Sequence, residues 1–228
     1  MAQTHGHSVD EYLETIYFLA FPIGEYRPST GSTAIAARVA EMLGVSRASA
    51  GEMLKRLEAD GLVERGEQKE DILTPDGAER AKRGVRKHRI IERFLTDFMG
   101  YTAAESHVHA DELGDTFSDE MIERINERLG GPDRCPHGWP VDPELEQTEN
   151  TELVALADLE AGTGAEIVRL AEHDGDLLHW YYEQGLVPGT SVEVRGAQPA
   201  AGQLTVAVEG AERAIAEKAA HGIYVRAA

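Results

Sequence analysis

Apolar residues recur at helical spacing through most of the first half of the chain. Val9, Leu13 and Ile16 begin such a pattern just after Ser8, a good N-cap residue, and the pattern runs to Pro22. Further helices are predicted at Thr33–Leu43, Arg47–Asp60, Pro75–Met99, Ala103–Asp115 and Phe117–Leu129. Between the third helix and the long fourth one, the patterns of Gly61–Arg65 and Asp71–Thr74 predict two short strands around a charged turn.

The second half of the chain changes character twice. Gly130–Asp158 is rich in proline and acidic residues and shows no periodicity, so we interpret it as an irregular linker. Beyond Gly164 the apolar spacing approaches two, which indicates a small α+β or barrel-like domain. Its strands are expected near Ile167–Ala171, Ser191–Arg195, Gln203–Val208 and Ile223–Arg226, and its helices near Asp174–Gln184 and Glu212–Ala219.

Composition narrows the class of protein. The chain has 228 residues and one cysteine, Cys135, which excludes an internal disulfide framework and a four-cysteine metal site. No apolar run is long enough to span a bilayer, so we expect no membrane partner and a reducing cytoplasm. The formal net charge is −19, but residues 1–98 carry only −2 of it. This nearly neutral part leaves room for a local basic face that binds DNA.

The pattern of Thr33–Thr74 predicts a winged helix-turn-helix. Its second helix, after the turn Gly44-Val45-Ser46, would enter the major groove of double-stranded DNA. Small polar residues and arginine at its start suit close approach to bases and phosphates. The candidate DNA-binding residues are Arg38, Ser46, Arg47, Ser49, Glu52, Lys55, Arg56 and Arg65.

Three helices carry carboxylates and imidazoles at intervals that place them on one face. His88 and Glu92 stand four residues apart. His107, Asp111 and Asp115 follow on the next helix, and Glu11 and Glu14 lie on the first. Each group alone suits a solvated surface, but together they offer the converging oxygen and nitrogen ligands that a divalent cation requires. Cys135 and His137 make a poor isolated metal pair, so we assign them to a structural strap.

A further set of motifs is distributed along the chain: Glu11–Tyr17, Gly61–Val63, Leu73–Gly77, Arg86–Arg89, Glu92–Leu95, Cys135–Pro140 and Leu186–Val194. Together these motifs resemble the diphtheria-toxin-repressor and manganese-transport-regulator family of metal-dependent transcriptional regulators. The resemblance covers nearly the whole chain, and the last motif is similar to the SH3-like domain of ferrous-iron transport accessory proteins.

The resemblance implies a mainly helical fold with a small β component. The expected parts are a winged helix-turn-helix domain, a helical metal-binding and dimerisation domain, an irregular linker and an SH3-like β-barrel domain. Their predicted boundaries are residues 1–75, 76–131, 132–158 and 159–228.

The resemblance also implies two metal sites. His88, Glu92 and His107 match the ancillary site of the family, whereas the principal site would take Glu11, Glu14, His88 and Asp111. The chain departs from the family where Gly114-Asp115 replaces a usual Glu-His pair, so the principal site is altered: it is either weaker or completed by Asp115 and water. Asp174 falls where the SH3-like domain supplies a carboxylate, although Leu177 replaces a polar ligand nearby. Carboxylates and imidazoles without sulfur favour Mn²⁺ or Fe²⁺.

We therefore predict a metal-dependent repressor of metal-uptake genes that binds an inverted-repeat operator as a homodimer and is not an enzyme. A bound cation would fix the first helix against the central helices, and apolar residues around Phe94 and Phe117 would form the two-fold interface. One alternative is a winged-helix regulator with a non-metal effector. The other is a metal-dependent hydrolase, against which the chain lacks the G-x-S-x-G, H-E-x-x-H and P-loop motifs.

Overall fold

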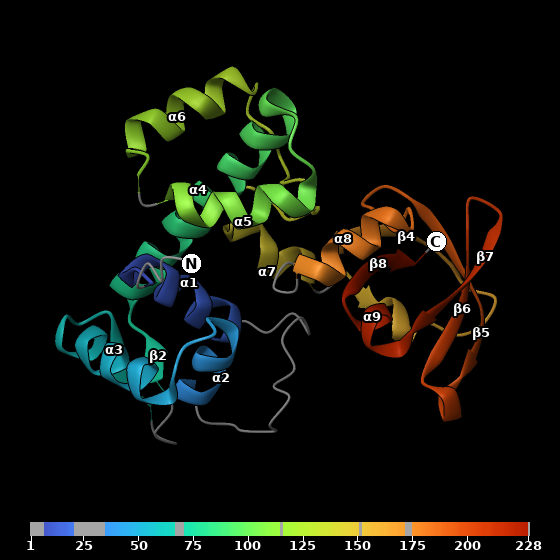
Figure 1. Ribbon diagram of the computed structural model, residues 1–228, viewed down its shortest axis with the longest axis horizontal. Coiled ribbons are helices and arrows are strands. Elements are labelled where there is room, and N and C mark those ends of the chain that lie inside the picture. Colours follow the sequence, from blue (N-terminus) through green and yellow to red (C-terminus); the bar gives the residue numbers. More distant parts are fainter. Residues whose placement is uncertain are drawn as a thin grey trace, which may run out of the picture. The chain divides into compact units, whose positions relative to one another are not determined.

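The chain divides into two compact units, Met1–Arg86 and Lys87–Ala228 (Figure 1). The computed structural model describes residues 7–20, 35–66, 71–114, 116–150, 152–171 and 175–227. Among these residues, every helix is too short or too polar to cross a lipid bilayer.

The first unit contains three helices and a two-stranded wing. Its elements are α1 (Val9–Ala20), α2 (Ile35–Met42), α3 (Arg47–Ala59), β1 (Val63–Arg65) and β2 (Asp71–Leu73). The predicted apolar stripes meet in one core, in which Leu13, Val39 and Leu57 are fully buried. Ser46 caps α3 by accepting a hydrogen bond from the backbone N–H of Ser49 at 3.0 Å. The predicted winged helix-turn-helix is thus confirmed within the described residues.

The wing leads directly into the long helix α4 (Pro75–Met99). Thr74 ties the two together, because its hydroxyl donates to the carbonyl of Gly61 and accepts from the N–H of Gly77. A Cβ atom on Gly77 would lie 1.9 Å from the carbonyl oxygen of Leu62, so only glycine permits this approach of helix and wing.

The second unit begins with a small helical core. Beyond the last part of α4 it contains α5 (Ala103–Gly114), α6 (Asp119–Arg128) and α7 (Glu144–Asn150). Ile90, Ile91 and Leu95 of α4 pack with Ala110 and Ile122. The helix α7 corrects the prediction that residues 130–158 are wholly irregular: charged residues conceal it, and ion pairs to buried arginines hold it in place.

The rest of the second unit is an antiparallel sheet with two helices, drawn in yellow to red in Figure 1. The strand order is β3-β8-β4-β5-β6-β7. The elements are β3 (Val154–Ala155), η1 (Leu156–Asp158), β4 (Gly164–Leu170), α8 (Gly175–Glu183), β5 (Ser191–Gln198), η2 (Pro199–Ala201), β6 (Gln203–Val208), β7 (Ala211–Ala216), α9 (Glu217–His221) and β8 (Ile223–Ala227). Apolar side chains from both the sheet and α8 form its core.

One predicted helix is wrong. Residues 212–219 form most of β7 and only the start of α9, although alanine and glutamate favour helix. The cause is the preceding two-residue turn, in which Glu209 and Gly210 both have positive φ (50° and 83°). Such a turn matches the twist of a hairpin, so it pairs Ala211 with Val208 and continues the sheet.

Candidate metal centre

Two helices of the second unit bring three predicted ligands together. His88 and Glu92 lie one turn apart on α4, and His107 faces them from α5. Oε1 of Glu92 is 3.0 Å from Nε2 of His88 and 3.0 Å from Nδ1 of His107. The two imidazole nitrogens are 3.1 Å apart. These ligand atoms all lie within 4.8 Å of one another, which is the spacing of donors around a single cation.

The segment Cys135–Pro140, which we call the strap, brings further donors to the same carboxylate. Nδ1 of His137 is 3.2 Å from Oε1 of Glu92, and Sγ of Cys135 is 3.9 Å from that nitrogen. The other ring nitrogen of His137, Nε2, donates to the carbonyl of Ala103 at 3.0 Å. That bond fixes the ring orientation and leaves Nδ1 to face Glu92, which is how metal-binding histidines are commonly held.

Glu92 lies at the centre of this group and is fully buried. Burial alone would raise its pKa, but the charges of His137 and His88 and the hydrogen bonds from His107 and His137 hold the pKa well below its usual range. Its second oxygen, Oε2, is buried without a hydrogen-bond partner among the described residues. A buried, ionised carboxylate with an unsatisfied oxygen and three imidazoles around it fits a divalent cation well.

Sequence reasoning missed His137 and Cys135 as members of this group. The strap motif was visible in the sequence, but the one imidazole and one thiol that it contains cannot form a metal site by themselves. Their relevance depends on Glu92, which lies far away in the sequence and reaches them only through tertiary packing. The fold shows that the strap, interpreted above as purely structural, borders the centre.

The other predicted ligands are Glu11, Glu14, Asp111, Asp115 and Asp174. Glu11 lies on α1 in the first unit, where its carboxylate accepts from the N–H of Ser8 at 2.5 Å and its N–H donates to the Ser8 hydroxyl. This reciprocal capping box gives Glu11 a local role. Glu14 is half-buried on the same helix. Leu177 packs on the apolar core around the sheet, as expected for a residue that is not a ligand. The Asp111 side chain, Asp115 and Asp174 lie outside the described residues.

The predicted DNA-binding residues lie on the surface of the first unit. Along α3, Arg47, Glu52, Lys55 and Arg56 are exposed, whereas Ala50, Leu54 and Leu57 on its other side are buried. Ser46 and Ser49 at the start of the helix are exposed as well, as is Arg65 on the wing, and Arg38 on α2 is half-buried. One face of α3 is therefore exposed, and the assignment of its residues to contacts with DNA stays a prediction.

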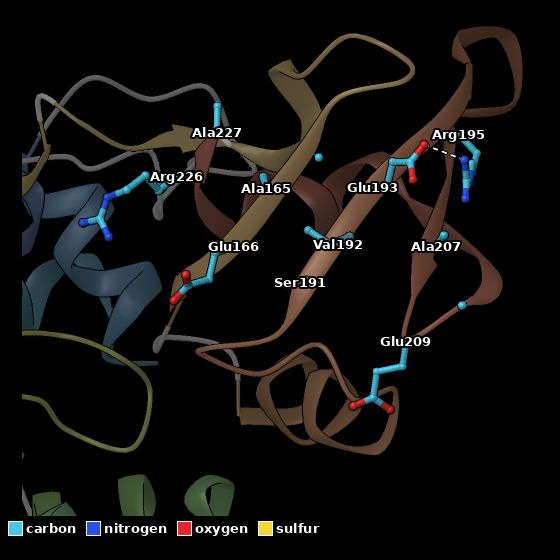
Figure 2. Close-up of a pocket in the computed structure, with 12 residues that line it drawn as sticks. Ala165, Glu166, Ser191, Val192, Glu193, Arg195, Ala207, Glu209, Arg226 and Ala227 are labelled. Atoms are coloured by element: carbon cyan, nitrogen blue, oxygen red, sulfur yellow. Dashed lines mark hydrogen bonds and ion pairs between the residues drawn. The ribbon is translucent and has the colours of Figure 1, made fainter.

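A separate hollow of about 690 Å³ lies on the sheet of the second unit (Figure 2). Glu193 and Arg195 form an ion pair there at 2.5 Å, and Glu166, Glu209 and Arg226 add further charge. It is lined by neither imidazole nor thiol, so its donors differ from those around Glu92.

Fold and site together define a class of protein: a winged-helix DNA-binding regulator with a buried group of candidate metal ligands and an additional small β domain. Family comparison is consistent with this class along the chain. Residues 6–70 match the iron dependent repressor N-terminal DNA binding domain, residues 74–142 the iron dependent repressor metal binding and dimerisation domain, and residues 154–227 the FeoA domain.

Individual relatives can be aligned with almost the entire chain. The iron-dependent repressor IdeR of Mycobacterium tuberculosis is 30% identical over 231 residues, which cover 96% of each chain. The diphtheria toxin repressor of Corynebacterium glutamicum is 29% identical over 96% of this chain and 95% of its own. A manganese-dependent transcriptional repressor, solved in complex with manganese, superposes with a TM-score of 0.82 at 27% identity, covering 97% and 100% of the two chains. The chain belongs to the iron-dependent repressor family of metal-dependent, DNA-binding transcriptional repressors.

Proposed function

We propose that this protein represses metal-uptake genes in the cytoplasm when a divalent cation occupies the centre formed by His88, Glu92, His107 and His137. The observation that carries the proposal is the buried Glu92 carboxylate, whose Oε1 lies 3.0–3.2 Å from three imidazole nitrogens. The cation would supply the positive charge that compensates this carboxylate. His88, Glu92, His107 and His137 would hold the cation, which would connect α4, α5 and the strap.

The donor set favours Fe²⁺ over Mn²⁺. A third imidazole and a thiol near the centre make it softer than the carboxylate-rich set expected from the sequence. Imidazole suits Fe²⁺ and thiolates suit softer metals, whereas Mn²⁺ prefers oxygen ligands. The role of Glu11, Glu14, Asp111, Asp115 and Asp174 as further ligands stays a sequence prediction.

Operator recognition is assigned to the exposed face of α3, with Arg47 at its start contacting bases or phosphates. Dimerisation is assigned to an apolar surface on α4 and α6. Phe98 is 60% exposed and Met121 46% exposed, and a hollow of about 300 Å³ lies between Phe94 and Ile125. Such exposed apolar patches mark protein–protein contacts, and a two-fold interface would place two copies of α3 one DNA turn apart.

A calorimetric titration of the metal-free protein with Fe²⁺ and Mn²⁺, under anaerobic conditions at fixed salt, tests the centre. Wild type is expected to bind Fe²⁺ more tightly than Mn²⁺. His107→Ala should weaken binding at least tenfold, because it removes one of four donors. His109→Ala, on the same helix but outside the donor group, is the control and should bind as wild type does. Equal cation affinity in both variants would show that the centre is wrongly placed.

A further inference from the structure

The strap is held to the sheet of the SH3-like domain by its backbone. The N–H of Leu170 on β4 donates to the carbonyl of His137 at 3.0 Å, and the indole N–H of Trp139 donates to the carbonyl of Leu170 at 2.8 Å. His137 thus faces β4 with its backbone and Glu92 with its imidazole. Its position at the cation centre depends on how the strap lies against β4.

Trp139 is fully buried and its ring contacts two arginines that come from different elements. The guanidinium carbon of Arg169, on β4, lies 4.6 Å from the centre of the indole ring, and that of Arg89, on α4, lies 5.3 Å from it. Arg89 also donates to the carbonyl of Pro140 at 2.7 Å and pairs with Glu146 of α7. Arg169 pairs with Glu149 of the same helix. Desolvated cation–π contacts of this kind are among the stronger ones, so the ring fixes the strap between α4 and β4.

Gly138 allows the backbone of the strap to lie directly against the backbone of β4. It has φ +90°, and a Cβ atom there would lie 1.9 Å from the carbonyl oxygen of Val168. Val168 lies at a shift of register between β4 and β8, between the paired positions Ile167 and Arg169. Gly138 therefore lies against β4 at the position of this register shift. Any side chain at position 138 must push the strap away from β4.

From these contacts we infer that Gly138 and Trp139 are positioning residues for the cation centre, and that they act by seating the imidazole of His137 against Glu92. The inference rests on the proposed function, because it assumes that His137 is a ligand. It adds that β4 of the SH3-like domain, which contributes no donor to the group around Glu92, sets the geometry of that group through the strap.

The test is a double-mutant cycle read by titrating metal-free full-length protein with Co²⁺, whose visible absorption reports its coordination. Gly138→Ala is expected to weaken Co²⁺ binding about tenfold or more, as for other changes that disturb the support of a ligand. Gly131→Ala is the matched control, since Gly131 also has positive φ (+67°) but a Cβ atom there would meet no other atom within 4 Å. It should leave Co²⁺ affinity unchanged.

The double-mutant cycle distinguishes an effect on the position of the His137 imidazole from a general disturbance of the fold. In a His137→Ala background, Gly138→Ala should cause no further loss, because both changes remove the same contact. An equal loss in both backgrounds, or wild-type Co²⁺ affinity in Gly138→Ala, would overturn the inference. If Gly138→Ala shows no cooperative thermal transition, Trp139→Phe replaces it. That variant keeps an aromatic ring but loses the donor to Leu170, and it should show a smaller, equally His137-dependent loss.

Two single variants distinguish failure of the inference from failure of the proposed function. If His88→Ala abolishes Co²⁺ binding while His137→Ala binds as wild type does, the cation is held by His88, Glu92 and His107 without His137, and the positioning role is refuted. If His88→Ala itself binds Co²⁺ with wild-type affinity, the proposed centre fails and the inference fails with it.

Discussion

A single carboxylate organises the metal centre at the scale of residues. Glu92 touches imidazoles that come from three segments, and helical spacing alone predicted only its contact with His88, one turn away. Periodicity predicted that His88 and Glu92 share a face, and the family resemblance added His107. The contact of Glu92 with His137 depends on the strap packing between α4 and β4. Such long-range packing leaves no periodic trace in the sequence.

The depressed pKa of Glu92 makes a prediction about stability in the absence of metal. Because the pKa is lower in the folded than in the unfolded chain, the ionised carboxylate stabilises the fold. This contribution is present above the unfolded-state pKa of about 4.3 and is lost as the pH falls through the folded-state pKa. Glu92→Gln should therefore cost about 3 kcal/mol at pH 7, the order of magnitude for breaking a buried ionic group, and less below about pH 4.

Urea unfolding in the presence of a chelator, between pH 3 and about pH 7, measures this difference. Glu112→Gln serves as the control, since Glu112 is exposed on α5 and its replacement should change stability by less than about 0.5 kcal/mol. A Glu92→Gln penalty that stays constant over the whole pH range would contradict the assigned ionisation.

At the scale of elements, the helices were predicted well because their apolar faces are periodic and their ends carry clear signals. The range of α4 agrees with the sequence prediction, and Ser46 and Pro75 mark helix starts as expected. Predictions failed where tertiary pairing overrides local preference. The strand β7 has helix-forming residues but follows a hairpin turn, and α7 has Leu145 as its one apolar residue and is held by Arg89 and Arg169.

Two glycines of α4 give an element-scale prediction. Gly77→Ala should destabilise the first unit by about 2–4 kcal/mol, because the new Cβ would collide with the Leu62 carbonyl and separate the wing from the helix. Gly84→Ala lies further along α4, where the new Cβ would meet no other atom within 4 Å. It should instead stabilise the helix by up to about 1 kcal/mol. Thermal unfolding of wild type and the two variants checks whether the stability changes have opposite signs. Destabilisation of equal size in both would contradict the close approach.

For the whole molecule, charge is distributed in the way a DNA-binding regulator requires. The net charge of −19 would oppose DNA binding if it were spread evenly, yet residues 1–98 carry only −2 of it and present the exposed arginines and lysine of α3. The sequence thus predicted the class of protein and named three residues, His88, Glu92 and His107, that the fold brings together. The geometry that seats the strap emerged only from the fold.

Cation binding and operator binding are expected to stabilise one another. The complete linkage cycle measures this coupling: operator affinity with and without Fe²⁺, and Fe²⁺ affinity with and without operator, at one salt concentration. We expect Fe²⁺ to tighten operator binding by about 5–150-fold, operator to tighten Fe²⁺ binding by the same factor, and His107→Ala to remove both effects. Operator affinity that is unaffected by Fe²⁺ in the wild-type protein would contradict this coupling.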